Sequence, residues 1–236
     1  MLTSELNTLC NQPTLRCLSS VSDKPVLYRK ENAEESPVKN IVVGQSHIHS
    51  LWNINFSHMP EINIPFDWIC QKEGNACSLA QIIVRLLHTA NTPMKISAII
   101  WEDSIADLSI TDIQDMVNIL EDTLKDYPQH KLALPECHMV PPDHELHNKV
   151  MMINWILAEF NEKQKYAKYP LYKSVMSNIK NKGLVVRPGK WKKKEDAPTT
   201  KLESSAKFNF VKFIRKFHAF GFKDDSSSSP TPIPTH

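Results

Sequence analysis

The feature that most constrains the fold is the alternation of short apolar runs with amphipathic stretches between residues 39 and 165. Four apolar runs predict strands, at 41–43, 64–70, 95–101 and 131–134. Three stretches with helical spacing of apolar residues accompany them, at 78–87, 110–124 and 148–165. Strands and helices that alternate in this way form parallel βαβ units with helices on both faces of the sheet. The sequence therefore predicts an α/β fold, a three-layer α/β/α sandwich around a short, mostly parallel sheet.

The chain divides by composition into one domain and two tails. Residues 1–38 are polar and aperiodic, so we expect a mostly disordered N-terminal arm. Residues 222–236 are rich in Ser, Pro and Thr, which predicts a disordered tail. The segment between them, 39–221, has the length of one domain. Its last helix is expected over about 205–220, and the residues on its inner face are Phe210, Phe213, Ile214 and Phe217.

Secreted, membrane and metal-binding classes are not favoured. The N-terminus has no basic segment followed by an apolar run, and no stretch approaches the ~20 apolar residues of a membrane span. The five cysteines are scattered and form no CxxC pair, which favours free thiols over a disulfide framework or a zinc site. We therefore expect an intracellular protein, cytoplasmic or nuclear, with no cofactor, no metal and no membrane association.

Three segments follow predicted strands and should meet at the carboxyl edge of the sheet, where ligand sites of parallel sheets collect. The first contains Gly44, Gln45 and Ser46, a tight turn on which a serine hydroxyl is a candidate nucleophile. The second contains Gly74, and the third spans residues 104–107. Ser46 and Gly74 also have structural explanations, because serine is a good N-cap and glycine suits a tight turn.

The order of these segments resembles the SGNH (GDSL-like) hydrolase family. It is closest in character to the divergent SGNH domains in the first-reading-frame proteins of LINE-type retrotransposons. The resemblance covers roughly residues 39 to 220 and rests more on order and spacing than on identity. It implies that Ser46 is at the nucleophile position, Gly74 at an oxyanion position and Asp196 at the acid position of the last catalytic block. It also implies a flavodoxin-like arrangement of strands and allows a transposon origin.

The chain departs from the family's pattern at four positions. Gln45 replaces an acidic residue and Ser104 replaces a glycine. Ala106 stands in place of the oxyanion asparagine, and Thr199 in place of the base histidine. Loss of one oxyanion donor typically costs ~10²–10³ in rate, and a serine without a positioned base is a poor nucleophile. The resemblance therefore implies that hydrolysis by the family mechanism is negligible.

Two functional hypotheses follow. In the first, a catalytically degenerate SGNH-like domain acts as a binding module for RNA or a protein partner. Lysines beside an aromatic ring suit contacts to phosphates and bases, although a solvated loop and helix face would explain the same charges. The candidate residues are Lys190, Trp191, Lys192, Lys193, Lys194, Lys212, Arg215 and Lys216.

The second hypothesis is an active serine esterase or acetyl-hydrolase. It keeps Ser46 as the nucleophile and uses as a relocated base either His49, three residues further along the chain, or one of the histidines that follow the fourth predicted strand, His138, His144 and His147. The two hypotheses differ in the position of the imidazole nearest to the Ser46 hydroxyl. An imidazole at hydrogen-bond distance, with a carboxylate behind it, favours the esterase.

Overall fold

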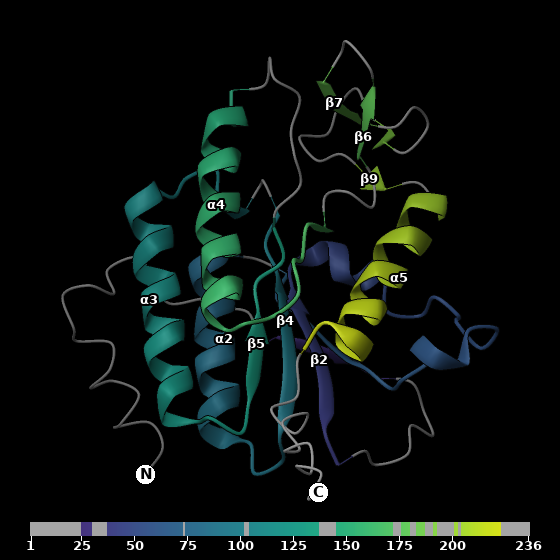
Figure 1. Cartoon of the computed structure of the whole chain (residues 1–236), viewed down its shortest axis with the longest axis vertical. Coiled ribbons are helices and arrows are strands. Elements are labelled where there is room, and N and C mark those ends of the chain that lie inside the picture. Colours follow the sequence, from purple (N-terminus) through teal and green to yellow (C-terminus); the bar gives the residue numbers. More distant parts are fainter. Residues whose placement is uncertain are drawn as a thin grey trace, which may run out of the picture.

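A five-stranded sheet in the order β1–β3–β2–β4–β5 forms the centre of the computed structural model (Figure 1). The structure describes residues 25–29, 37–72, 74–101, 104–136, 145–171, 176–179, 183–186, 191–192, 201–202 and 204–222, with the backbone alone between 176 and 205. The strands of the sheet are β1 (Val26–Tyr28), β2 (Lys39–Gly44), β3 (Asp67–Cys70), β4 (Met94–Ile99) and β5 (Lys131–Ala133). Strands β2 to β5 are parallel, and β1 joins β3 in the antiparallel direction.

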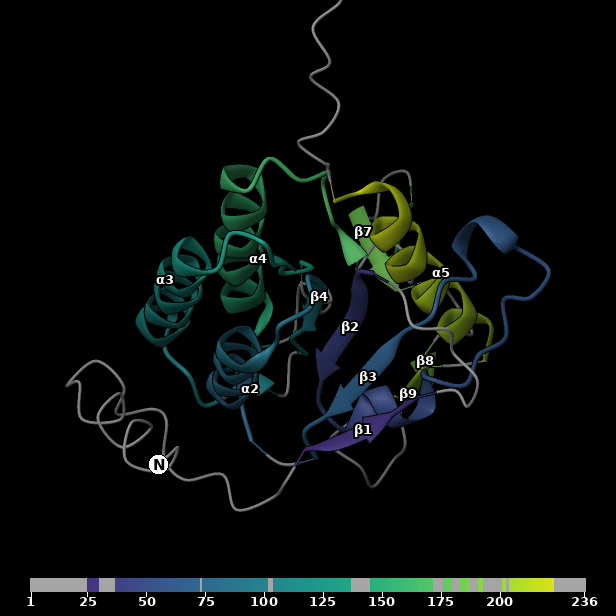
Figure 2. The ribbon, with the colours of Figure 1, turned by 90° about the horizontal axis from the view of Figure 1, so that it is seen from below.

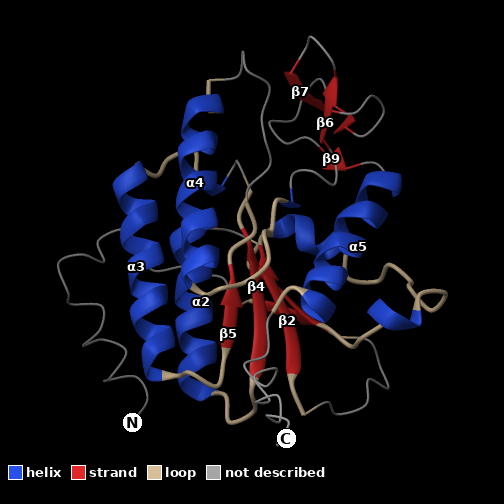
Figure 3. Ribbon diagram, viewed as in Figure 1, coloured by secondary structure: helices blue, strands red, loops and turns tan. Residues whose placement is uncertain are grey.

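Helices cover both faces of the sheet, which confirms the predicted α/β/α sandwich (Figure 3). One face carries α2 (Ala76–Thr89), α3 (Ile110–Asp126) and α4 (His147–Lys163). The other carries α5 (Ser204–Phe220) and the short 3-10 helices η2 (Ser46–Ser50) and η3 (Pro60–Ile62). Two antiparallel strand pairs precede α5: β6 (Met176–Ile179) with β7 (Gly183–Val186), and β8 (Trp191–Lys192) with β9 (Lys201–Leu202).

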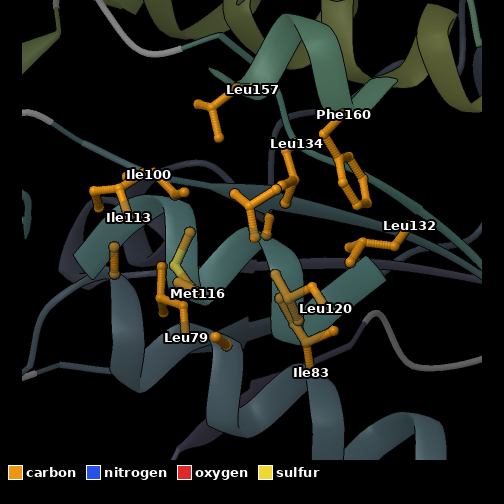
Figure 4. Packing of buried hydrophobic residues seen from close by; sticks show 14 of the residues in the cluster. Leu79, Ile83, Ile100, Ile113, Met116, Leu120, Leu132, Leu134, Leu157 and Phe160 are labelled. Carbon is orange, nitrogen blue, oxygen red and sulfur yellow. The ribbon is translucent and has the colours of Figure 1, made fainter. Parts of the chain in front are cut away.

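The central strands are apolar on both sides because both faces of the sheet are covered. In β2, Ile41 and Val43 pack toward α2, α3 and α4, whereas Val42 packs toward α5. The first of these two cores is mostly aliphatic (Figure 4), and its labelled residues include Leu79, Ile83, Met116, Leu132, Leu157 and Phe160. The second core is rich in aromatic rings, among them Phe56, Trp68, Trp101, Tyr169, Phe210 and Phe217.

The predicted N-terminal arm is wrong at β1. Val26, Leu27 and Tyr28 pair with Cys70, Ile69 and Trp68, so this short segment is part of the sheet (Figure 2). Its β-branched and aromatic residues favour a strand, and β3 would otherwise present an open row of backbone donors and acceptors. The predicted tail is also wrong at its first residue, because Phe222 is buried against Phe217 and Tyr166. Residues 1–24 and 223–236 lie outside the described residues.

Within the described ranges, no helix has the length and apolar character needed to cross a membrane.

Candidate functional site

The neighbouring strands β2 and β4 are parallel, but the strands that follow them in the chain lie on opposite sides of this pair. The chain leaves β2 for β3 on one side, and it leaves β4 for β5 on the other. This reversal is the topological switch point at which open parallel sheets bind ligands, just outside the carboxyl ends of the strands. Gly44 ends β2 and Ile99 ends β4, so the turn with Ser46 and the residues that directly follow β4 lie at this point.

Gly44 is required by the close packing of η2 on β2. A Cβ atom at this position would lie 2.6 Å from Cγ1 of Ile48 and 3.4 Å from the carbonyl oxygen of Ile99. The absence of a side chain lets the chain turn sharply and seat Ile48, which is fully buried, beneath the turn. The same turn presents Ser46 to solvent.

Ser46 is the first residue of η2, whereas Gln45 occupies the N-cap position in an extended conformation. The Ser46 hydroxyl makes no hydrogen bond to any described residue. The N-cap explanation for this serine is therefore not supported. An exposed hydroxyl at the switch point is positioned to meet a ligand, but the residues around it decide whether it can react.

Gln45 joins the first two predicted segments. Its side chain is only 6 % exposed, and its Nε2 donates to the carbonyl oxygen of Gly74. Gly74 has a φ of 113°, a conformation that favours glycine. Among the described residues, Oε1 of Gln45 is buried without a hydrogen-bond partner. Gln45 thus ties the serine turn to the glycine loop and leaves one acceptor unused.

The two histidines of the turn contact aromatic side chains. The ring of His47 packs on Trp101 with centroids 4.4 Å apart. His49 Nδ1 lies 2.9 Å from the hydroxyl of Tyr28, a residue of β1, and the two rings are 5.3 Å apart. No hydrogen bond between Ser46 and an imidazole exists in the described part of the chain. The predicted base is therefore engaged by β1, a strand that sequence reasoning had not placed in the domain.

The third segment lacks an oxyanion donor at the expected position. Ser104 is buried, and its hydroxyl donates to the carbonyl oxygen of Trp101 at 2.6 Å. Ala106 is exposed, and its carbonyl oxygen accepts from Nζ of Lys149 at 2.7 Å. The alanine side chain offers no donor. The segment is thereby tied to α4 through Lys149.

The last predicted block lies mostly outside the described residues. Asp196, Thr199, Lys190, Lys193 and Lys194 are all in the undescribed part of the chain. The backbone of Trp191 and Lys192 forms β8, which pairs with Leu202 and Lys201.

Of the three α5 cations named as candidate contacts to nucleic acid, only the two lysines are accessible to solvent. Lys216 is exposed and Lys212 is partly exposed.

Arg215, a candidate for contacts with nucleic acid, is buried and is not part of the exposed surface of α5. Its side chain is 3 % exposed, and Nη1 donates to the carbonyl oxygens of Ile62 and Ile64 at 3.1 and 2.8 Å. The guanidinium also lies 5.0 and 4.9 Å from the ring centroids of Phe56 and Phe66. Burial lowers its pKa to about 10, so it remains charged at neutral pH. Arg215 therefore fastens α5 to the chain at Ile62 and Ile64. Nothing in the sequence indicates that these two carbonyl groups need a side-chain donor.

A buried Ser–His–Asn chain was missed by sequence reasoning. The Ser97 hydroxyl lies 2.9 Å from Nε2 of His218, and Nδ1 of His218 lies 3.2 Å from Oδ1 of Asn40. Because an amide oxygen only accepts, Nδ1 carries the proton and Nε2 accepts from serine. Ser97 is completely buried in β4 beneath α5, so the chain holds the helix to the sheet. The available signal was His218 at position i+4 from Ile214, on the apolar face of the helix.

No three described His, Cys, Asp or Glu side chains are arranged to hold a metal ion. A scan of protein-family models finds none that matches the chain, and a search of curated proteins finds no match.

Proposed function

We propose that the chain is a non-catalytic, SGNH-like module that binds RNA through the outer face of α5. The carrying observation is the charge of this helix. Residues 204–220 contain four cationic residues and no acidic residue, a net charge of +4; Arg215 is buried, so Lys212 and Lys216 carry the charge of the outer face. On the opposite face of the sheet, α3 contains five acidic residues and one lysine, a net charge of −4. This separation supports binding of a polyanion along one side of the molecule.

The lysines of α5 are available for such contacts. Neither Lys212 nor Lys216 forms an ion pair within the described residues. The lysines of the opposite layer are engaged, because Lys125 lies 2.9 Å from Asp122, and Lys163 lies 3.5 Å from Glu121. Phosphate oxygens would supply the α5 lysines with charge-assisted contacts that no described carboxylate supplies.

The geometry around Ser46 supports a role without catalysis. The hydroxyl has no described base, His49 is bonded to Tyr28, and Ala106 offers no side-chain donor. Among the described residues, this serine has no proton acceptor, and the position of Ala106 supplies no side-chain donor to an oxyanion.

The first prediction concerns the affinity for RNA. We expect the Lys212→Gln/Lys216→Gln variant to bind a short fluorescein-labelled single-stranded RNA more weakly than the wild type. Each lost phosphate contact should reduce the slope of log affinity against log salt by about 0.7. Fluorescence anisotropy between about 50 and 200 mM KCl measures both quantities.

The matched control is Lys125→Gln/Lys163→Gln, which removes the same charge from the opposite layer. It should bind RNA almost as the wild type does. An equal loss in both double variants would mean that only net charge matters, and absence of wild-type binding at the lowest salt would refute the proposal.

The serine esterase is retained as a second candidate, because Ser46 is exposed at the switch point. We predict that wild-type protein and Ser46→Ala hydrolyse short-chain p-nitrophenyl esters at the same background rate. The circular dichroism spectra of both proteins serve as the folding control. Activity that is present in the wild type and lost in Ser46→Ala would establish the esterase instead.

A further inference from the structure

One aromatic ring is exposed on the outer face of α5, the face that carries Lys212 and Lys216. Phe220, the last residue of the helix, is 68 % exposed. The aromatic residues of the inner face, Phe210 and Phe217, are buried. Lys216 lies one helical turn before Phe220 and on the same side, because residues four apart are neighbours on a helix surface. An aromatic ring left in water beside a cation is unexplained by the packing of the domain.

The backbone beneath Phe220 is firmly fixed. The Gly221 amide donates to the carbonyl oxygen of Phe217 at 2.6 Å, and the Ala167 amide donates to the carbonyl oxygen of Gly221 at 3.1 Å. A Cβ atom at Gly221 would lie 2.4 Å from the ring of Phe217, so only glycine fits there. Phe222 then packs edge-on against Phe217 and Tyr166, with centroids 5.0 Å apart in both pairs. The ring of Phe220 is therefore presented from a rigid base.

The same contacts bring two more cations to this end of α5. The hydrogen bond from Ala167 to Gly221 places the loop after α4 beside Phe220, and Lys165 and Lys168 in that loop are exposed. Neither lysine forms an ion pair with a described residue, and Glu162 at the end of α4 pairs with neither of them. The exposed ring thus lies at the same end of α5 as cations from two segments distant in sequence.

We propose that Phe220 stacks against an unpaired RNA base, while Lys216 and the Lys165–Lys168 loop contact the flanking phosphates. This inference rests on the proposed function and specifies its ligand as single-stranded RNA. Base stacking on aromatic rings and a cationic track are the two elements of single-strand recognition. An anionic membrane would be attracted by the same charges, but insertion strength scales with apolar area and one ring supplies little.

The experiment compares Phe220→Ala, Phe220→Leu and Phe220→Trp in binding to a uridine-rich single strand and to an RNA duplex of equal length. Phe220→Ala and Phe220→Leu should weaken single-strand binding roughly 5- to 100-fold, which corresponds to one stacked base. Phe220→Trp should retain it. Duplex binding should change little in any variant, because paired bases offer no face to the ring. Thermal unfolding verifies that each variant is folded.

The matched control is Trp155→Ala, which removes an aromatic side chain that is 69 % exposed on α4. It should bind RNA as the wild type does. Wild-type binding to RNA with no loss in Phe220→Ala would overturn this inference and leave the proposed function intact. No wild-type binding to RNA would overturn both. Vesicles containing phosphatidylserine provide the last arm, and Phe220-dependent binding to them without RNA binding would assign the surface to membranes.

Discussion

The imidazole of His218 is buried and has a strongly lowered pKa. It is 1 % exposed, and its pKa falls to about 3 because burial disfavours the charged ring, with Lys95 and Arg215 adding repulsion. The ring is enclosed by Phe66 and Phe222 and bonded to Ser97 and Asn40. A neutral imidazole that must gain a proton on unfolding makes stability depend on pH.

This imidazole predicts a loss of stability in acid. The pKa of His218 in the folded state lies below the unfolded value of 6.5, so protons favour the unfolded chain. Its contribution is fully present above pH 6.5 and is lost as the pH falls from there toward 3. Between pH 7 and pH 5 the free energy of unfolding should drop by about 2 kcal/mol through this group.

Urea titrations of wild type and His218→Gln at the two pH values measure the effect. The variant is expected to be less stable at pH 7, but its loss between the two pH values should be smaller by that amount. His130 is buried with a lowered pKa and contributes in the same direction to both proteins, so it cancels in the comparison. An identical pH dependence in both proteins would show that His218 is not the titrating group.

The burial and the partners of single polar residues could not be predicted from the sequence. Arg215 and His218 are adjacent to or within the apolar face of α5, and the sequence pattern cannot say whether partners cover them. Their partners, Ile62, Ile64, Ser97 and Asn40, are more than a hundred residues away in the chain. Ser46 was different, because a glycine turn after a buried strand predicts an exposed serine locally.

The element that depends most on such distant partners is α5. It is joined to the η3 segment by Arg215, to β2 and β4 by His218, and to Tyr169 by Phe217, whose ring stacks at 3.7 Å. Each of these contacts is on the inner side of the helix. Lys216 and Phe220, on the opposite side, are exposed to solvent. A helix held in this way can carry its lysines outward without losing its position.

Replacement of Arg215 tests this account of α5. Arg215→Met keeps much of the apolar stem but leaves the carbonyl oxygens of Ile62 and Ile64 without their donor. We expect the free energy of unfolding to fall by about 2–3 kcal/mol, as for lost hydrogen bonds to a charged group. Lys212→Met on the same helix should change it by no more than about 0.5 kcal/mol. Urea denaturation gives both values, and equal stability of the two variants would contradict the anchoring role.

Across the whole molecule, periodicity was sufficient for the layer architecture. The apolar runs at 41–43 and 95–101 lie in the central strands β2 and β4. A strand covered on both faces is apolar at consecutive positions, so it stands out in the sequence as a continuous run. Periodicity was insufficient for β1, since three residues are too few to show a pattern. The candidate site was predicted at its turn and its glycine loop, whereas the engagement of His49 by Tyr28 could only follow from β1.

The pairing of β1 with β3 also sets where the domain can be cut. A fragment beginning at Lys39, where the apolar pattern starts, would lose the three residues that cover β3. The backbone groups of β3 would then form an open edge, and such an edge is a template for pairing with another chain. It would lose as well the Tyr28 ring, which stacks on Trp52 and holds His49. Three residues thus cover the edge of β3, which a fragment beginning at Lys39 would leave open to pairing with another chain.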